Sequence, residues 1–544
     1  MADQPSNKYL TQEIEGLRSF AVFMPMIFLA VAALVLNVLL TRLAEQQRTV
    51  VGTLKALGYS DTQVFVHFLK FGLAVGLAGG VAGCVLGYIL AELLTMTYRT
   101  VFEFPELNNH LYLDLILTAL AISLACATLG SLRGTRAVLR LKPAEAMRPK
   151  PPRRGGKILL QRITFFWNRL SVGWRMVFRS VVRSRVRSLA GIFAAAMGAA
   201  VLSCGFMMVE ATYYLVDFQF KWLIKSDIEL TFKDEQPRRA LSEVARLPGV
   251  DRAEPLLNVA CTFQNGHRRH KGGVTGLAPD ATLTVPRDTQ ARVIRVPSAG
   301  LAMTRKLAEM LDLQPGDTVT IRPTKGLRHP VEVPVAEIAD SYLGTAVYTN
   351  IDYLSRLIGE EFALTGVQVK MNNSAADHSA FYRQLKRLPA IRGVANRQAM
   401  VQSLEQTIIV SMMVFIVVLV VFAGIIFFGS ILNSALVSLA ERRREVATLR
   451  TLGYGPWQIG SLLLRESLVL TVLGTLLGMP IGYGLTVATA MSYESELMRF
   501  PVIASQRTWS ATAVLALLFT VLAYLFVQWA VHRMDWLEAL QAKE

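Results

Sequence analysis

The sequence predicts an α-helical membrane protein with about seven transmembrane helices, in two parallel three-helix repeats plus one extra span, and an α+β extracytoplasmic domain. Three observations predict this fold class. The 544 residues are 52% apolar or aromatic and only 18% charged, which is too apolar for a soluble chain of this length. Seven stretches of about 20 residues lack charges, and a helix of that length crosses a bilayer. One part of the chain recurs 395 residues later.

The seven charge-free stretches are the expected spans, at residues 20–40, 71–91, 115–132, 189–209, 408–435, 467–491 and 510–531. Basic residues orient them. Sixteen Lys or Arg, but only one acidic residue, Glu145, fall between Arg133 and Arg187, which is a positive-inside signal. We therefore expect a cytoplasmic C-terminus, with residues 1–18 and 210–407 outside.

Alignment of the chain with itself divides it into segments. Shifting it by 395 residues places Leu-Lys-Ala-Leu-Gly-Tyr at 54–59 on Leu-Arg-Thr-Leu-Gly-Tyr at 449–454. Two units in the same orientation imply a pseudo-twofold axis along the membrane normal. The expected segments are an outer tail at 1–18, the first three-helix unit at 19–148, a basic linker and interfacial helix at 149–188, a single span at 189–209, the outer domain at 210–407 and the second three-helix unit at 408–544.

Arginines alternate with aromatic and aliphatic residues in the stretch 163–188. This pattern predicts one amphipathic helix at the membrane surface, with apolar residues in the acyl boundary and arginines on lipid phosphates. A solvated basic linker is the alternative.

The polar region 210–407 has the composition of a soluble α+β domain. We expect strands at 227–232, 318–321, 331–338 and 365–371, and helices near 237–246, 303–312 and 352–358. Pro315-Gly316-Asp317 predicts a turn that enters a strand. At almost 200 residues the region can form its own core, in one or two lobes.

Several kinds of site are excluded by residue patterns. The net charge of +17 gathers beside the spans, so it indicates topology and not nucleic-acid binding. The four cysteines lack zinc spacing and three lie in expected spans, so no disulfide is expected. His267 and His270 enclose two arginines that would repel a metal ion, and Asn265-Gly266 predicts a hairpin turn. We expect no catalytic, cofactor-binding or metal-binding residues.

Two short charged helices, at 45–57 and 441–452, are the candidate functional elements. Each follows a span and ends at Gly-Tyr, and in the second Val446, Leu449 and Leu452 recur on one side. Such a helix can dock into a groove on a partner, whereas the alternative is an ordinary solvated loop. The residues expected to make this contact are Glu45, Arg48, Leu54, Leu57, Gly58, Glu441, Arg444, Glu445, Leu449, Leu452 and Gly453.

Glycines four residues apart form a stripe in the second span of each unit. Such stripes let helices approach closely in lipid, so we expect a shared packing role. The six residues are Gly79, Gly83, Gly87, Gly474, Gly478 and Gly482. The chain lacks the G-x-x-x-x-G-K-[ST] loop that cradles nucleotide phosphates, so we do not expect it to hydrolyse ATP itself.

The segment from Glu441 to Tyr454, together with the three spans and Pro-Ala-Glu-Ala-Met-Arg at 143–148, resembles the FtsX-like permease family of ABC transporters. That family includes MacB-type and lipoprotein-releasing permeases. The resemblance implies that a half consists of one span, an outer domain and three further spans, and residues 189–531 look like one such half. It also implies that the helix after the second span contacts an ABC ATPase dimer, which uses the ATP.

The resemblance further implies a non-enzymatic permease of the bacterial cytoplasmic (inner) membrane. Export or extraction of an amphipathic lipid, lipoprotein or peptide is the first expectation, with membrane lipids and a periplasmic or membrane-fusion protein as further partners. Mechanotransmission to an extracytoplasmic partner without substrate movement is the alternative. An ion-coupled carrier is a third, and the absence of Asp, Glu, Lys and Arg from the expected spans argues against it.

The first half departs from the family pattern, because only eighteen polar residues precede the first three-helix unit, which begins at Ser19. A leading span and an outer domain are thus expected to be missing there. A fragment or mis-started reading frame of a larger permease, a naturally reduced form and one piece of a split permease remain open explanations.

Overall fold

The structure is a computed structural model, and it describes residues 25–26, 28–34, 36–37, 41, 47–101, 109–139, 164–342, 344–372, 375–404, 410–441, 443–492 and 499–533. The chain divides into two compact units, which are described separately. The sheet unit comprises Met1–Gly16, Met208–Val410 and Ala488–Ile503. The helix unit comprises Leu17–Met207, Ser411–Val487 and Ala504–Glu544.

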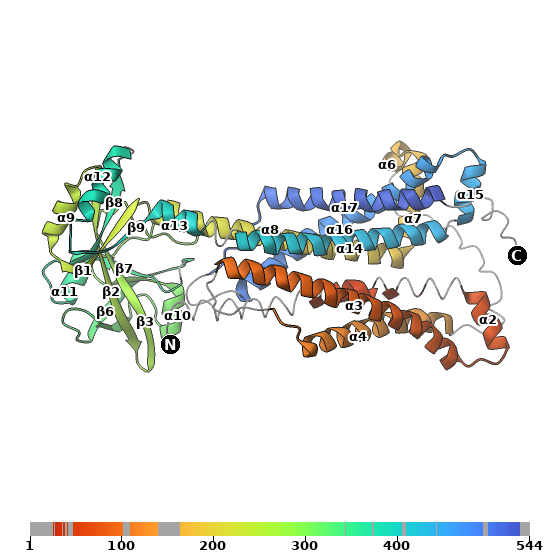
Figure 1. Cartoon of the computed structure of the whole chain (residues 1–544), viewed down its shortest axis with the longest axis horizontal. Coiled ribbons are helices and arrows are strands. Elements are labelled where there is room, and N and C mark those ends of the chain that lie inside the picture. Colours follow the sequence, from red (N-terminus) through yellow and green to blue (C-terminus); the bar gives the residue numbers. More distant parts are fainter. Residues whose placement is uncertain are drawn as a thin grey trace. The chain divides into compact units, whose positions relative to one another are not determined.

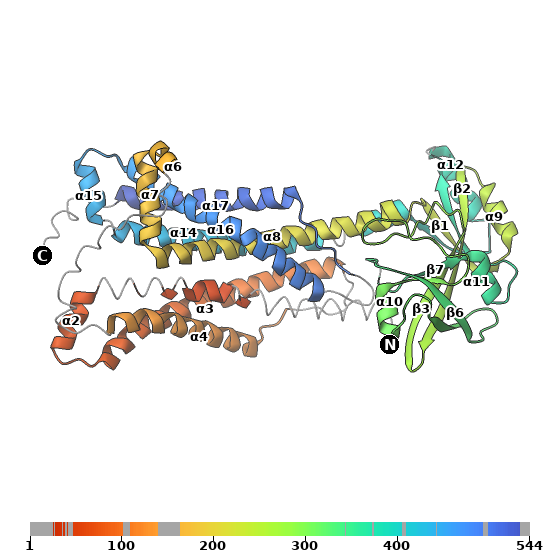
Figure 2. The same cartoon turned by 180° about the vertical axis from the view of Figure 1, so that it is seen from behind.

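The helix unit consists mainly of long apolar helices (Figures 1 and 2). Before the sheet unit the chain forms α2 (Arg48–Ala56), α3 (Asp61–Val101), α4 (Leu113–Leu139), α6 (Thr164–Arg169), α7 (Val172–Arg183) and α8 (Arg185–Asp217). After it come α14 (Val410–Glu441), α15 (Arg443–Thr451), α16 (Pro456–Ser492) and α17 (Gln506–Arg533). The described residues between Pro25 and Thr41 are also helical, and we call them the first-span segment.

Six of the seven expected spans coincide with helices that are long and apolar enough to cross a membrane. These helical stretches are Asp61–Met96, Leu113–Ser131, Arg185–Leu223, Ile416–Leu439, Pro456–Ser492 and Gln506–Arg533. The remaining expected span, 20–40, is only partly described: residues 25–26, 28–34 and 36–37 are helical, and the others lie outside the described residues. A multi-pass membrane protein is therefore the class of this chain.

The linker before α8 differs from the single amphipathic helix expected at 163–188. Two helices, α6 and α7, occur there, and α8 already begins at Arg185. Ser171 is extended and Ser184 is non-helical, so each interrupts the helix. Part of the apolar side of α7 packs against protein, because Val177 and Val181 are buried against Leu470 of α16.

The sheet unit is built on one nine-stranded sheet in the order β3-β7-β4-β6-β5-β2-β8-β1-β9. Its strands are β1 (Ile228–Gln236), β2 (Val250–Asn265), β3 (Arg268–Leu277), β4 (Leu301–Thr304), β5 (Thr318–Pro323), β6 (Val331–Ala339), β7 (Val347–Asn350), β8 (Leu364–Met371) and β9 (Ile391–Asn396). A π-helical turn, Phe218–Leu223, links α8 to β1. The helices are α9 (Arg238–Ala245), α10 (Arg305–Leu311), α11 (Ile351–Leu357), α12 (Ala375–Leu385) and α13 (Arg397–Leu404).

All four expected strands and all three expected helices of the outer domain are present, within a few residues of their predicted ends. The hydrophobic core has one large cluster around Phe263 and Ile321 and another around Leu230 and Phe381. The 16-residue strand β2 pairs with β5 and β3 near the first cluster and with β8 near the second. The two lobes considered from the sequence are therefore parts of one continuous sheet.

Candidate functional site

Helices α2 and α15 end in the same backbone geometry. Gly58 and Gly453 follow them in the left-handed region, at φ +94° and +91°. In both, the amide of the next tyrosine donates to the carbonyl of the leucine five residues earlier, at 3.1 and 3.0 Å. This is a Schellman-type cap, which glycine adopts without steric cost. The repeated Leu-Gly-Tyr sequence thus closes both helices in the same way.

The apolar side of α15 is divided between an anchor and an exposed end. Val446 is only 6% exposed and belongs to a cluster with Ile459 and Leu463 of α16. Leu449 is half-buried, whereas Leu452 is 71% exposed. The expected docking face of three apolar residues is therefore reduced, because Val446 holds α15 to its own unit. Leu57, the counterpart of Leu452, is also 71% exposed.

The other predicted contact residues are placed unevenly. Leu54 is half-buried and Glu445 is exposed. Arg48 is the first residue of α2 and Arg444 lies in α15, and Glu45 lies outside the described residues. Glu441, expected in the second charged helix, is instead the last residue of α14.

The two glycine stripes have different surroundings. A Cβ added at Gly478 would lie 2.7 Å from the Cβ of Ala199 in α8 and closer still to the carbonyl oxygen of Ala196. Gly474 and Gly482 are equally tight against α8, with backbone carbonyls 2.8 Å from the added atom. In α3, by contrast, no described residue comes within 4 Å of a Cβ added at the counterpart of each of the three, namely Gly79, Gly83 and Gly87.

A charged network lies buried where α7, α8, α14 and α16 meet. Arg187 of α8 pairs with one carboxylate oxygen of Glu466 in α16. The other oxygen accepts hydrogen bonds from the hydroxyls of Ser180 and Ser438, each at 3.2 Å. Sequence reasoning missed this network, because the expected spans began at 189 and 467 whereas α8 and α16 begin at Arg185 and Pro456. Both charges therefore lie within the long helices.

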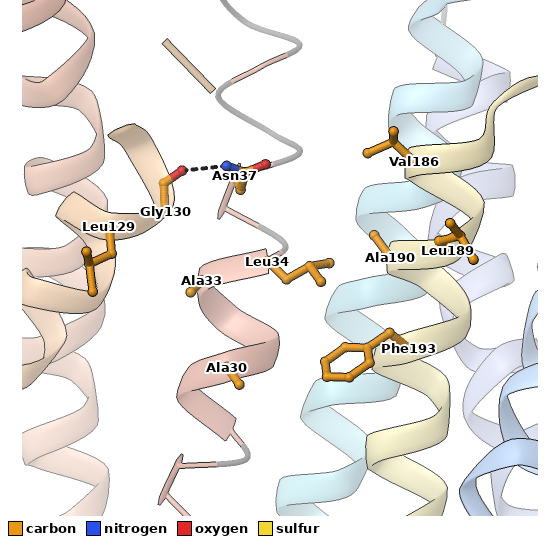
Figure 3. Close-up of a pocket in the computed structure, with 10 residues that line it drawn as sticks. All are labelled: Ala30, Ala33, Leu34, Asn37, Leu129, Gly130, Val186, Leu189, Ala190 and Phe193. Carbon is orange, nitrogen blue, oxygen red and sulfur yellow. Dashed lines mark hydrogen bonds between the residues drawn. The ribbon is translucent and has the colours of Figure 1, made fainter. Parts of the chain in front are cut away.

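A cavity of about 800 Å³ lies between the first-span segment, α4 and α8 (Figure 3). Leu34 and Phe193 project into the gap from opposite helices in Figure 3, and Asn37 turns away to donate to the carbonyl of Gly130 at 3.0 Å. The described residues that line it are all uncharged: Ala30, Ala33, Leu34, Asn37, Leu129, Gly130, Val186, Leu189, Ala190 and Phe193. None of these was a predicted site residue, because small and aliphatic residues in spans carry no distinguishing pattern.

The first-span segment is held from two sides. Its Asn37 bonds to α4, and its Phe28 ring stacks on Phe422 of α14 with centroids 5.3 Å apart. The cavity wall is thus built on a segment that joins helices from both halves of the chain.

The outer hairpin follows the prediction. Gly266 has φ +57° and lies in the turn that connects β2 to β3, so His267 belongs to the turn and His270 is the third residue of β3. Across the described part of the chain, no group of three or more His, Cys, Asp or Glu residues is arranged to hold a metal ion.

Two segments of the chain, residues 22–143 and 411–535, match the model of the FtsX-like permease C-terminal family. No curated protein matches the sequence. The periplasmic region of MacB from Actinobacillus actinomycetemcomitans is similar at 11% identity and a TM-score of 0.26, over 36% of this chain and 99% of that chain. The extracellular domain of the noncanonic ABC-type transporter YknZ from Gram-positive bacteria is similar at 14% identity and a TM-score of 0.23, over 32% and 100%. These two likenesses are too distant to carry an argument about function.

Proposed function

The chain carries two FtsX-like permease domains, and from this premise we propose that it is the permease subunit of an ABC transporter whose ATPase is a separate chain. In this proposal α2 and α15 are the coupling helices, on the cytoplasmic side of the inner membrane, against which an ATPase dimer closes. The observation that carries the proposal is that both helices end in the same way, with a glycine in the left-handed backbone region preceded by a leucine that is 71% exposed. An exposed leucine on a short charged helix suits an apolar groove on a soluble partner.

We propose an amphipathic cargo, namely a lipid, lipoprotein or peptide. The supporting observation is the cavity beside Leu34 and Phe193, whose described lining residues are uncharged and, apart from Asn37, apolar or small. An acyl chain can fill such a space without leaving a polar group unpaired. Membrane lipids, and a periplasmic or membrane-fusion protein that receives the cargo, are then the further partners.

Mechanotransmission is the second candidate, and the continuity of α8 favours it. This helix and the π-helical turn after it run from Arg185 to Leu223 without a break, and β1 begins at Ile228. A shift at one end of such a helix would be carried to the first strand of the sheet unit with no substrate moving.

The docking assignment is tested with the full chain in lipid nanodiscs and the ABC ATPases encoded in the same genome. Leu452→Asp and Leu57→Asp should each lower the permease-dependent ATPase rate, since a charge cannot enter an apolar groove. The matched control is Leu111→Asp, which changes a leucine that is 64% exposed just before α4. Unchanged ATPase binding and rate in both coupling-helix variants would contradict the assignment.

Export and transmission are separated by following a fluorescent phosphatidylethanolamine in proteoliposomes during ATP hydrolysis. If the lipid moves, Leu34→Trp should slow its movement because the larger ring fills the cavity. Met26→Trp, at an exposed position of the same segment, is the control. ATP hydrolysis that drives a change in the sheet unit but moves neither lipid nor peptide would favour transmission.

A further inference from the structure

The buried network around Glu466 joins elements that the coupling proposal leaves unconnected. Its four residues come from four helices, and each is at most 4% exposed: Ser180 in α7, Arg187 in α8, Ser438 in α14 and Glu466 in α16. The carboxylate uses both oxygens, one toward the arginine and one toward the two serines. A movement of any one helix therefore displaces a partner of the same carboxylate.

The burial of these charges does not by itself mean that the ion pair stabilises the fold. A buried ion pair often contributes no more to stability than well-packed apolar residues of the same size, because both ions lose their hydration. Buried polar groups do, however, specify one arrangement of helices over others in some proteins. The network is thus better suited to fixing the relative positions of its helices than to strengthening the fold.

Two members of the network, Ser438 and Glu466, lie in the helices directly before and after α15. Ser438 is three residues before the end of α14, and Glu466 lies within the first turns of α16, so the two flank α15 in the chain. Val446 anchors α15 on the same two helices, in the cluster that contains Leu439 and Leu463. Force applied to α15 would therefore reach Ser438 and Glu466 through packed side chains.

The other side of the network is the start of α8 and the helix before it. Arg187 is the third residue of α8, and Ser180 lies on α7, which packs through Val177 and Val181 against Leu470. The guanidinium of Arg465 lies over the Trp174 ring, 5.6 Å from its centroid, and further fixes α7 to α16. Helix α7 and the start of α8 are thus packed against the helices that flank α15 in the chain.

The first coupling helix lacks this tie. The residues 395 positions before Ser438 and Glu466 are Leu43 and Phe71, and neither can carry a charge or bind a guanidinium through a carboxylate. Among the described residues, α2 makes a contact close to itself in the chain, the 2.6 Å ion pair of Lys55 with Asp61 at the start of α3. The two coupling helices therefore have different connections to the rest of the helix unit.

We propose that Glu466, with Arg187, Ser180 and Ser438, is a positioning group that makes α15 the coupling helix that drives α8, whereas α2 serves for docking. This inference rests on the proposed permease function. The two ATPase contacts are then mechanically unequal: movement of α15 reaches α8 and the sheet unit, and movement of α2 does not reach them by this route.

The test compares hydrogen exchange of the full chain in nanodiscs, bound to the ATPase found in the docking experiment, with and without ATP. Arg187→Met combined with Glu466→Met replaces the pair by unbranched apolar residues, which keeps the volume and leaves no buried charge. Glu466→Gln is the second variant. The matched control is Thr471→Val with Thr520→Val, which removes a buried 2.9 Å hydroxyl contact between α16 and α17 and leaves α8 untouched.

In the wild-type complex and in the control, ATP should change exchange in α15 and in residues 172–190. In both network variants the change in α15 should remain, while the change in 172–190 is lost and the ATPase stays bound. A double-methionine variant that unfolds at the wild-type temperature and still shows the ATP response at 172–190 would overturn the positioning role. Absence of any ATP response in the wild-type complex would instead overturn the permease proposal on which this role rests.

Discussion

The two glycine stripes allow one perturbation to be made at matched positions. Gly478→Ala adds a methyl group where α16 crosses α8, and Gly83→Ala adds the same group at the corresponding position of α3. At Gly478 the new Cβ would lie 2.7 Å from the Cβ of Ala199 and 3.0 Å from the Cα of Ala196. Backbone atoms cannot rotate away, so α16 and α8 would have to separate. At Gly83 the same atom meets no described residue within 4 Å.

The magnitude follows from two opposing terms. Alanine is favoured over glycine in a helix by about 1 kcal/mol, and this gain applies at both positions. Overpacking of a tight contact costs about 1–3 kcal/mol, and this cost applies only at Gly478. The helix term cancels in the comparison, so the free energies of unfolding of the two variants should differ by about 1–3 kcal/mol, or about 5- to 150-fold in the folded-to-unfolded ratio.

The assay is reversible unfolding of the full chain in bicelles by added SDS, followed by far-ultraviolet circular dichroism. Gly83→Ala should match or exceed the wild type, and Gly478→Ala should unfold at lower SDS than Gly83→Ala. Equal stability of the two variants would refute the tight crossing, since a methyl group would then cost the same with and without α8 beside it.

Three further predictions concern the sheet unit. Burial raises the pKa of the Glu229 carboxyl above its ordinary 4.5, against the opposing effect of a hydrogen bond from Gln368. The folded state therefore binds the proton more tightly than the unfolded state does. The resulting stabilisation is fully present below the ordinary pKa and is lost as pH rises through the raised pKa. Glu229→Gln should therefore raise the unfolding temperature at about pH 7.5 and leave it unchanged at about pH 3.5, and an equal shift at both would contradict this sign. The side chain of Asn350 accepts from two backbone amides at the start of α11, at 2.8 and 3.4 Å; Asn350→Ala should cost about 1 kcal/mol in chemical unfolding, with Asn350→Asp as the control that keeps the acceptor. Burial raises the pKa of the Cys261 thiol to about 11, so in a variant with Cys261 as its one cysteine a maleimide should react only after unfolding, and rapid labelling of the native protein would count against the buried placement.

Local pattern was sufficient for much of the fold. Charge-free stretches located six helices that can cross a membrane, because span length is set by bilayer thickness and needs no knowledge of neighbours. Gly266 and Gly453 marked a hairpin and a helix end, because each must adopt φ above zero whatever surrounds it. The strands at 331–338 and 365–371 were predicted correctly because alternation of apolar and polar residues is likewise a local pattern.

Pattern was insufficient where a strand departs from short alternation. β2 runs over 16 residues, includes Pro255, and pairs with three other strands, so its polar and apolar residues do not alternate toward a single neighbour. The order of the sheet likewise depends on contacts between residues more than 100 positions apart, such as Val250 with Met371. Such pairings leave no mark in any one segment.

For α2 and α15, the sequence by itself determined that two short charged helices recur with Leu-Gly-Tyr at their ends, because an αL cap depends on local residues only. Tertiary structure decided which side chains those helices expose: Val446 is buried because α16 folds back over it, and Leu452 is left outside. It also decided that one glycine stripe is covered by α8 and that Arg187 meets Glu466, 279 residues away in the chain. Burial and charge pairing are properties of what lies nearby in space, so no local pattern contained them.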